Sequence, residues 1–80
     1  MSTFSVKYEP SAIDVTFTGH ALHVVLADGR EVSVPLAWFP RLLTASAEQL
    51  SNWRLIGGGV GIHWPDVDED VSVERLMALA

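Results

Sequence analysis

Four acidic side chains in five consecutive positions are the residues of this chain best suited to bind a cation. They are Asp66, Asp68, Glu69 and Asp70. Hard cations such as Ca²⁺ take several carboxylate oxygens, but an EF-hand loop also needs a glycine at its sixth position and a glutamate at its twelfth. Counted from Asp66, those positions hold Val71 and Met77. The spacing therefore favours a solvated acidic turn that precedes a helix, and we expect no metal ion and no cofactor.

Three histidines, His20, His23 and His63, are the other candidate ligands, because imidazole nitrogens bind zinc. His20 falls in a predicted turn and His23 on the strand after it, whereas His63 falls on the outward face of a later strand. This spacing favours three surface histidines over one zinc site.

Motifs for covalent catalysis or phosphate binding do not occur either. Neither Gly-x-Ser-x-Gly nor Ser-x-x-Lys is found, and the run Gly57-Gly58-Gly59 lacks the lysine of a phosphate loop. We therefore expect a protein that is not an enzyme. The alternative hypothesis is a small metal- or ligand-dependent enzyme that uses His63 and the nearby carboxylates.

Trp38 is the candidate anchor for a binding partner. It lies off the helical stripe formed by Leu36, Phe39, Leu42 and Leu43, and it stands close to Pro40. Exposed tryptophans often dominate the energy of protein interfaces. A half-buried tryptophan of the core is the alternative. Trp64, by contrast, aligns with Val60 and Ile62 on one strand face and is predicted to fill the core.

Composition narrows the class of protein. The chain has 80 residues, of which 49% are hydrophobic and 19% charged, and it contains no cysteine. We expect one domain with a marginally stable core, no disulfide and no thiolate metal site. The net charge of −5 opposes direct binding of nucleic acid, which requires clustered Lys and Arg. No signal peptide and no apolar run of roughly 18–20 residues is present, which predicts a cytoplasmic protein that does not cross a membrane.

The elements that must position these residues follow from the hydrophobic period. Residues 1–11 show no period and are predicted to be a flexible arm, and residues 12–80 are predicted to form a single α+β domain. Ile13, Val15 and Phe17 alternate as the inward face of a first strand. Two further strands follow, at 21–26 and 31–34, with Val32 and Val34 inward, and Asp28-Gly29 between them predicts a two-residue hairpin turn with positive φ at both positions.

Helical and strand patterns then alternate. A short helix is predicted to begin near Pro40, or a kinked one near Leu36, and Ser46 with Gln49 forms a capping box. Strands at 53–56 and 60–64 are joined by the three glycines, and Ser72 is predicted to cap a last helix. The result is a small antiparallel sheet of about five strands, in the order β-β-β-α-β-β-α, packed by short helices.

Several motifs also resemble those of a bacterial family, domain of unknown function 2442. The matching residues are Asp28-Gly29-Arg30, the run 34–42 (Val-Pro-Leu-Ala-Trp-Phe-Pro-Arg-Leu), Asn52-Trp53, Ile56-Gly57-Gly58-Gly59 and the run 61–74, which contains Trp64-Pro65-Asp66. The resemblance implies a small α+β fold and a companion from another small family, domain of unknown function 4160, in two-gene arrangements reminiscent of toxin–antitoxin pairs. Some longer relatives carry a helix-turn-helix, which this chain lacks.

The sequence thus predicts a non-enzymatic protein-interaction module, an antitoxin-like partner of a small cognate protein. The residues expected to bind that partner are Trp38, Pro40, Asp66, Asp68, Glu69 and Asp70. A central aromatic anchor with a charged rim is typical of protein interfaces. A plain homodimer that buries its sheet edge or its Trp38 face is a further alternative.

Overall fold

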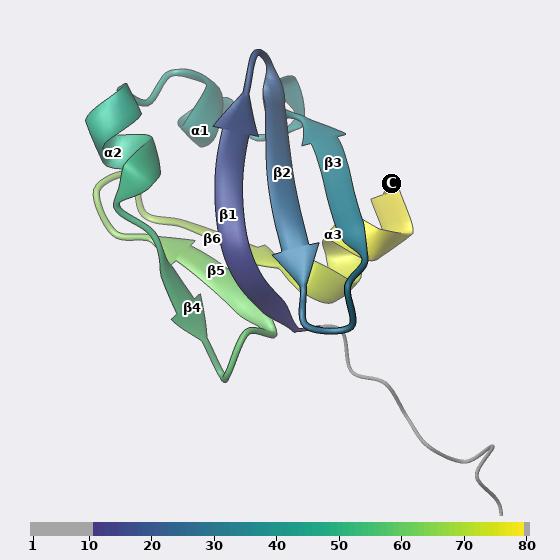
Figure 1. The fold of residues 1–80 in the computed structure, drawn as a ribbon. Helices are drawn as coiled ribbons and strands as arrows, with labels where there is room; N and C mark the ends of the chain where they lie inside the picture. Colours follow the sequence, from purple (N-terminus) through teal and green to yellow (C-terminus); the bar gives the residue numbers. More distant parts are fainter. Residues whose placement is uncertain (1–10, 80) are drawn as a thin grey trace, which may run out of the picture.

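Two three-stranded antiparallel sheets form the frame of residues 11–79, the part of the chain that the computed structural model describes. The first sheet contains β1 (Ala12–Thr18), β2 (Ala21–Leu26) and β3 (Glu31–Pro35), and the second contains β4 (Arg54–Ile56), β5 (Gly61–Trp64) and β6 (Glu69–Ser72), each in that order. Figure 1 shows the first sheet in front of the second. The α+β class is confirmed, but the prediction of one sheet of about five strands is wrong.

Short helical segments carry the chain from the first sheet to the second. A 3₁₀ turn, η2 (Leu36–Trp38), is followed by α1 (Pro40–Leu43) and α2 (Ala47–Ser51), and α3 (Val73–Leu79) follows β6. Helix α1 begins at Pro40, one of the two predicted alternatives, because proline needs no amide donor in a first turn. The capping box of Ser46 and Gln49 is also confirmed, and the Ser72 hydroxyl accepts a hydrogen bond from the Arg75 amide at 3.1 Å.

A β-bulge at the start of β1 reverses the predicted face of Ile13. Ala12 pairs with Leu26 and Asp14 with Val25, so Ile13 is an extra residue in the ladder. Ala12 is consequently buried, whereas Ile13 is 57% exposed. Val15 is buried and Phe17 packs against the core, as predicted. The arm predicted for residues 1–11 lies outside the described residues except for Ser11, whose carbonyl accepts from the Ala27 amide at 2.8 Å.

The β2–β3 turn also differs from its prediction. The Leu26 amide donates to the Arg30 carbonyl at 2.8 Å, so the loop has three residues rather than two. Gly29 has a φ of +93°, but Asp28 is not among the residues with positive φ. A type I turn closed by one left-handed residue matches the strand twist as well as the predicted two-residue turn would.

Strand β6 is the element that the sequence analysis missed. Residues 69–72 were assigned to an acidic turn and a helix cap, but they pair with β5 through Ile62 and Val71. Burying the Val71 side chain beside Ile62 favours the strand over the solvated turn that the acidic residues predict. The acidic run is therefore divided, with Asp66 and Asp68 in the turn and Glu69 and Asp70 on the strand.

One hydrophobic core lies between the two sheets and the helices. Trp64 is fully buried at its centre, as predicted, and its indole N–H donates to the Leu50 carbonyl at 3.0 Å. Val60 and Leu43, which were predicted to face inward, are 43% and 48% exposed. Val60 precedes β5 in the glycine turn, and α1 is too short to turn both Leu42 and Leu43 inward. Among residues 11–79, no helix has both the length and the apolar character needed to span a bilayer.

Candidate protein-binding groove

A groove of about 470 Å³ joins η2 to strand β6 and to the start of α3. Its lining residues are Trp38, Phe39, Glu69, Asp70, Val71, Ser72 and Arg75. Three of the six predicted partner-binding residues, Trp38, Glu69 and Asp70, thus meet on one surface.

Local backbone geometry turns the Trp38 side chain outward. Pro35 ends β3, and the Leu36 amide donates to the His20 carbonyl at 2.7 Å, which fixes the start of η2. The Phe39 amide donates to the Leu36 carbonyl at 2.9 Å, closing a single tight turn. Leu36 and Phe39 are buried, whereas Trp38 remains 49% exposed. Of the two alternatives for Trp38, an exposed anchor or a half-buried core residue, the structure shows a side chain with about half of its surface exposed.

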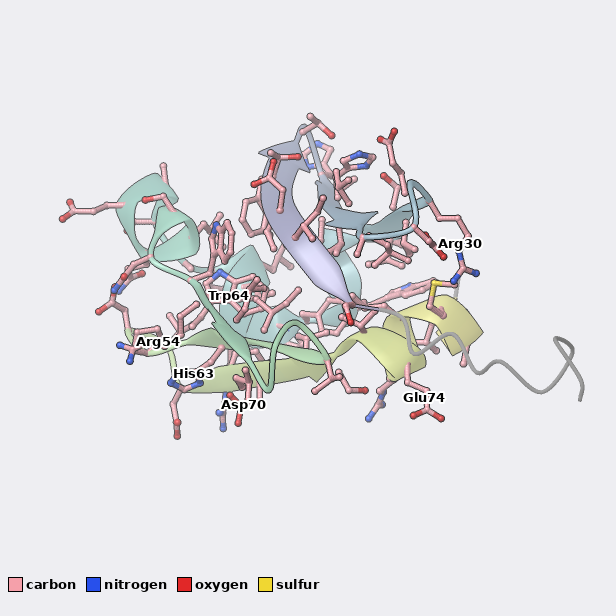
Figure 2. All side chains as sticks on the ribbon, turned by 60° about the horizontal axis from the view of Figure 1, so that its bottom comes forward. Arg30, Arg54, His63, Trp64, Asp70 and Glu74 are labelled. Carbon is pink, nitrogen blue, oxygen red and sulfur yellow. The ribbon has the colours of Figure 1, made fainter. Side chains whose placement is uncertain are left out.

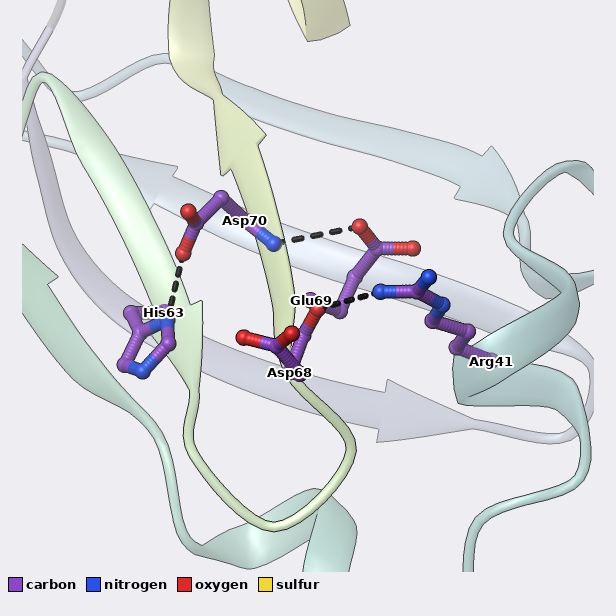
Figure 3. Close-up of polar contacts among 5 residues, drawn as sticks. All are labelled: Arg41, His63, Asp68, Glu69 and Asp70. Carbon is purple, nitrogen blue, oxygen red and sulfur yellow. Dashed lines mark hydrogen bonds and ion pairs between the residues drawn. The ribbon is translucent and has the colours of Figure 1, made fainter.

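The position of β6 depends on the turn that precedes it. Asp68 has a φ of +52°, a left-handed conformation that aspartate tolerates better than most residues. The Arg41 guanidinium of α1 donates to the Asp68 carbonyl at 2.5 Å. Figure 3 shows this contact beside Glu69. Helix α1 therefore fixes the position of the β5–β6 turn through Arg41. This turn positions Glu69 and Asp70 at the groove.

Asp70 connects the groove to the outer face of the second sheet. Its carboxylate pairs with the His63 imidazole on β5, and its backbone amide donates to the Glu69 carboxylate at 3.1 Å (Figure 3). Arg54, His63 and Asp70 occupy one rung of the three strands. In Figure 2 they project from the sheet face opposite to the buried Trp64. The rung therefore places a guanidinium, an imidazole and a carboxylate side by side across the three strands.

The remaining predicted partner-binding residues lie outside the groove lining. Asp66 accepts a hydrogen bond from the Asn52 amide group at 3.0 Å and thereby ties the β5–β6 turn to the end of α2. Asp68 supplies its carbonyl to Arg41. Pro40 starts α1 and its carbonyl accepts from Thr44. The roles visible for these three residues are structural.

Phe39, Val71, Ser72 and Arg75 line the groove but were not predicted as site residues. Val71 and Ser72 lie on the strand that was not recognised, and Arg75 follows it on α3, so no local pattern in the sequence marks these three. Phe39 was assigned to the core, where most of its surface does lie.

His23 and His63 lie on different sheets and do not form a common site. His23 is on the first sheet, where its two ring nitrogens bond to Ser33 at 2.9 Å and Glu31 at 2.6 Å, while His63 is on the second sheet. Within residues 11–79, no three histidine or carboxylate side chains lie close enough together to hold a metal ion.

A second hollow of about 310 Å³ lies between β1 and α2. It is lined by Val15, Thr16, Phe17, Ala47, Leu50, Ser51 and Trp53. Phe17, Leu50 and Trp53 in this lining are partly buried residues packed against the core, and none of the lining residues is charged.

Comparisons with known proteins place this fold among proteins of unknown function. A crystal structure of a protein of unknown function from Rhodospirillum rubrum ATCC 11170 is 32% identical and superposes with a TM-score of 0.76, covering 89% of this chain and 88% of that one. A solution NMR structure of an uncharacterized protein from Chromobacterium violaceum is 23% identical with a TM-score of 0.72, covering 85% of this chain and 64% of that one, a likeness of fold alone. The search of curated proteins gave no match.

The family model described as "Protein of unknown function (DUF2442)" matches residues 12–80. This match spans every described strand and helix, and it agrees with the resemblance seen in the motifs at residues 34–42 and 61–74. The chain therefore belongs to the DUF2442 family.

Proposed function

We propose that this protein is a non-enzymatic interaction module that binds a second protein in the groove between Trp38 and β6. The observation that carries the proposal is the half-exposed indole of Trp38 beside an acidic strand. Tryptophan is enriched among the residues that dominate binding energy, because it buries a large apolar surface with few rotatable bonds.

Charge indicates the kind of partner. Two carboxylates, Glu69 and Asp70, and one guanidinium, Arg75, line the groove, so acidic groups outnumber basic ones there, and the whole chain carries a net charge of −5. A basic partner surface would be steered toward this face and oriented on it by electrostatic complementarity. The partner we propose is a small protein of the companion family, domain of unknown function 4160, with this chain acting as its antitoxin-like neutraliser. The match to the DUF2442 family, whose resemblance implies a companion from that second family, and the two carboxylates of the groove support this pairing.

Calorimetric titration of the full chain with a purified protein of that companion family tests the proposal. Trp38→Ala should weaken binding by about 2 kcal/mol, roughly thirtyfold, if the indole is the anchor. Leu43→Ala is the matched control, because Leu43 is 48% exposed on α1 but does not line the groove. Equal losses in the two variants, or no binding by the unmodified chain, would contradict the proposal.

The His63–Asp70 pair favours one alternative, a small metal- or ligand-dependent enzyme. Zinc or calcium binding tighter than about 100 μM, lost in Asp70→Asn, would support it, since dedicated sites bind in that range or below it. The other alternative, a homodimer, predicts a doubled mass in sedimentation experiments and burial of Trp38 without any second protein.

A further inference from the structure

Strand β6 is an edge strand, and its four residues form one side of the groove. Within the described part of the chain it pairs with β5 alone. The lining of the groove includes all of Glu69, Asp70, Val71 and Ser72. An edge strand turns a row of N–H and C=O groups away from its sheet, and an extended chain can pair with that row.

The register identifies which backbone groups face the groove. The Val73 amide donates to the Val60 carbonyl at 3.0 Å, and the ladder continues with Ile62 opposite Val71. Hydrogen-bonded pairs alternate in an antiparallel ladder, so the backbone groups of Val71 face β5 and those of Asp70 and Ser72 face away from it. Arg41 occupies the Asp68 carbonyl, and the Ser72 carbonyl accepts the first hydrogen bond of α3, so the accessible edge is limited to the Asp70 backbone groups and the Ser72 amide.

We infer that the partner binds by adding an extended segment antiparallel to β6, in which basic residues alternate with apolar ones. This inference rests on the proposed function and specifies its mode. A residue paired directly with Asp70 has its side chain on the same sheet face as Asp70, where Lys or Arg forms a cross-strand ion pair. Its neighbour points to the face of Val71, toward Phe39 and Trp38, where an apolar side chain fits.

In the free protein, the Glu69 side chain covers one of the backbone donors of this edge. Its carboxylate accepts the hydrogen bond of the outward-facing Asp70 amide at 3.1 Å. A covered donor and a nearby negative charge are devices by which edge strands avoid pairing with other chains. An incoming lysine or arginine compensates the displaced carboxylate, which an apolar or acidic segment cannot do. The Glu69 carboxylate therefore favours a basic segment over an apolar or acidic one.

A second copy of this chain suits the edge less well. Each copy brings a net charge of −5, and the groove places Glu69 and Asp70 at the contact. Like charges brought together across a strand pair are destabilising. Charge complementarity thus favours a basic segment from a different protein.

The test uses a capped peptide, Thr-Val-Lys-Val-Lys-Val-Thr, titrated into the full chain and followed by amide NMR. Two variants are matched in size: one is N-methylated on both lysines and the other on two of the valines. In the inferred geometry the lysine amides face β6, so methylating them should weaken binding about tenfold or more, because the hydrogen bond to the Asp70 carbonyl is lost and the methyl groups meet the strand edge. Methylating the valine amides, which face solvent, should leave the affinity unchanged. A peptide with Glu in place of Lys should bind at least about tenfold more weakly.

The amides of Asp70 and Ser72 should also exchange more slowly with solvent when the lysine peptide is bound, while those of β4, the opposite edge of the sheet, should not change. The inference is overturned if the peptide fails to bind at about 1 mM, a weak affinity by any standard, if both methylated peptides bind alike, or if the chain pairs with itself through β6 in sedimentation. If the companion protein binds and Trp38→Ala weakens that binding, while the peptide does not bind, then strand addition is disproved but the proposed function is not. Failure of the companion protein to bind counts against the proposed function itself.

Discussion

Trp38 and Trp64 show how backbone context assigns different roles to one residue type. Trp64 is fully buried on β5, and its ring meets that of Phe17 edge to face with centroids 6.2 Å apart. Its indole N–H is satisfied by the Leu50 carbonyl. Trp38 lies on a 3₁₀ turn in which Leu36 is the buried residue, and about half of the Trp38 side chain is exposed. Trp64 therefore stabilises the core, whereas Trp38 leaves apolar surface exposed beside β6.

Trp64→Phe should therefore destabilise the protein, whereas Trp38→Phe should not. Replacing Trp64 removes a buried donor, leaves the Leu50 carbonyl without its partner and opens a cavity, at a cost of about 2 kcal/mol or more. Trp38→Phe, the matched control at an exposed site, should change the free energy of unfolding by less than about 0.5 kcal/mol. Urea unfolding measures both. Equal midpoints in the two variants would show that Trp64 is not central to the core.

Asp28 should make stability depend on pH in acid. The Arg30 backbone amide donates to its carboxylate at 3.0 Å and the Arg30 side chain at 2.6 Å, and these contacts hold the pKa of Asp28 below its ordinary value of 3.8. A carboxyl whose pKa is lower in the folded state stabilises the fold above its unfolded pKa, and this contribution is lost as the pH falls through the folded pKa. Asp28→Asn should lower the melting temperature at pH 6, and the difference should vanish as the pH falls through that lowered pKa. A difference that is constant over this pH range would contradict the linkage.

At the scale of elements, the two sheets are joined at one corner where β1 meets the β4–β5 turn. The Ala12 amide donates to the Gly59 carbonyl at 2.7 Å. Gly59 has a φ of +109°, and a Cβ at this position would lie 2.5 Å from the Ala12 carbonyl oxygen. The backbone of the turn therefore approaches β1 more closely than any other residue type permits.

Gly59→Ala should consequently cost much more stability than Gly58→Ala. Both positions have positive φ, but a Cβ on Gly58 meets nothing within 4 Å. Gly58→Ala should cost about 1 kcal/mol through backbone strain alone. Gly59→Ala should cost about 3 kcal/mol or more, because overpacking against β1 adds to the strain. Thermal unfolding separates the two, and a Gly59 variant as stable as the Gly58 variant would mean that the sheets can part at this corner without penalty.

How far the sequence predicts each element depends on how local its determinants are. The capping box of Ser46 and Gln49 was predicted because both partners lie in one helical turn. The bulge at Ile13 was not, since it depends on how Ala12 aligns with Leu26 across the sheet. Strand β6 was missed because its acidic residues favour a turn locally, while its pairing with β5 is decided by the burial of Val71.

At the scale of the whole molecule, the candidate site exists only because η2 and β6 meet, although about thirty positions separate them in the chain. Residue types were enough to name Trp38, Glu69 and Asp70 as binding candidates. Residue types alone could not show that Asp66 and Asp68 lie outside the groove lining, because this depends on where β6 begins. Arg75 could not be named either, because it reaches the groove only through the packing of β6 and α3.

The division of the acidic run yields a prediction on association rates. Neutralising Glu69 and Asp70 together, as Glu69→Gln and Asp70→Asn, should slow association with the basic partner and flatten its salt dependence. The pair Asp66→Asn and Asp68→Asn removes the same charge outside the groove lining, and asparagine tolerates the positive φ of Asp68. This second pair should have the smaller effect. Stopped-flow mixing at several salt concentrations measures both pairs, and identical rates would mean that steering depends on net charge alone.

The most direct test of the account follows the three indole N–H resonances of the chain while the companion-family protein is added. Trp38 lines the proposed groove, Trp53 lines the second hollow beside α2, and Trp64 is buried and bonded to Leu50. Binding in the groove predicts that the Trp38 resonance shifts or broadens while those of Trp53 and Trp64 stay in place. Binding that leaves the Trp38 resonance unmoved, or that moves the Trp53 resonance instead, would contradict the proposal that this protein binds its partner in the groove between Trp38 and β6.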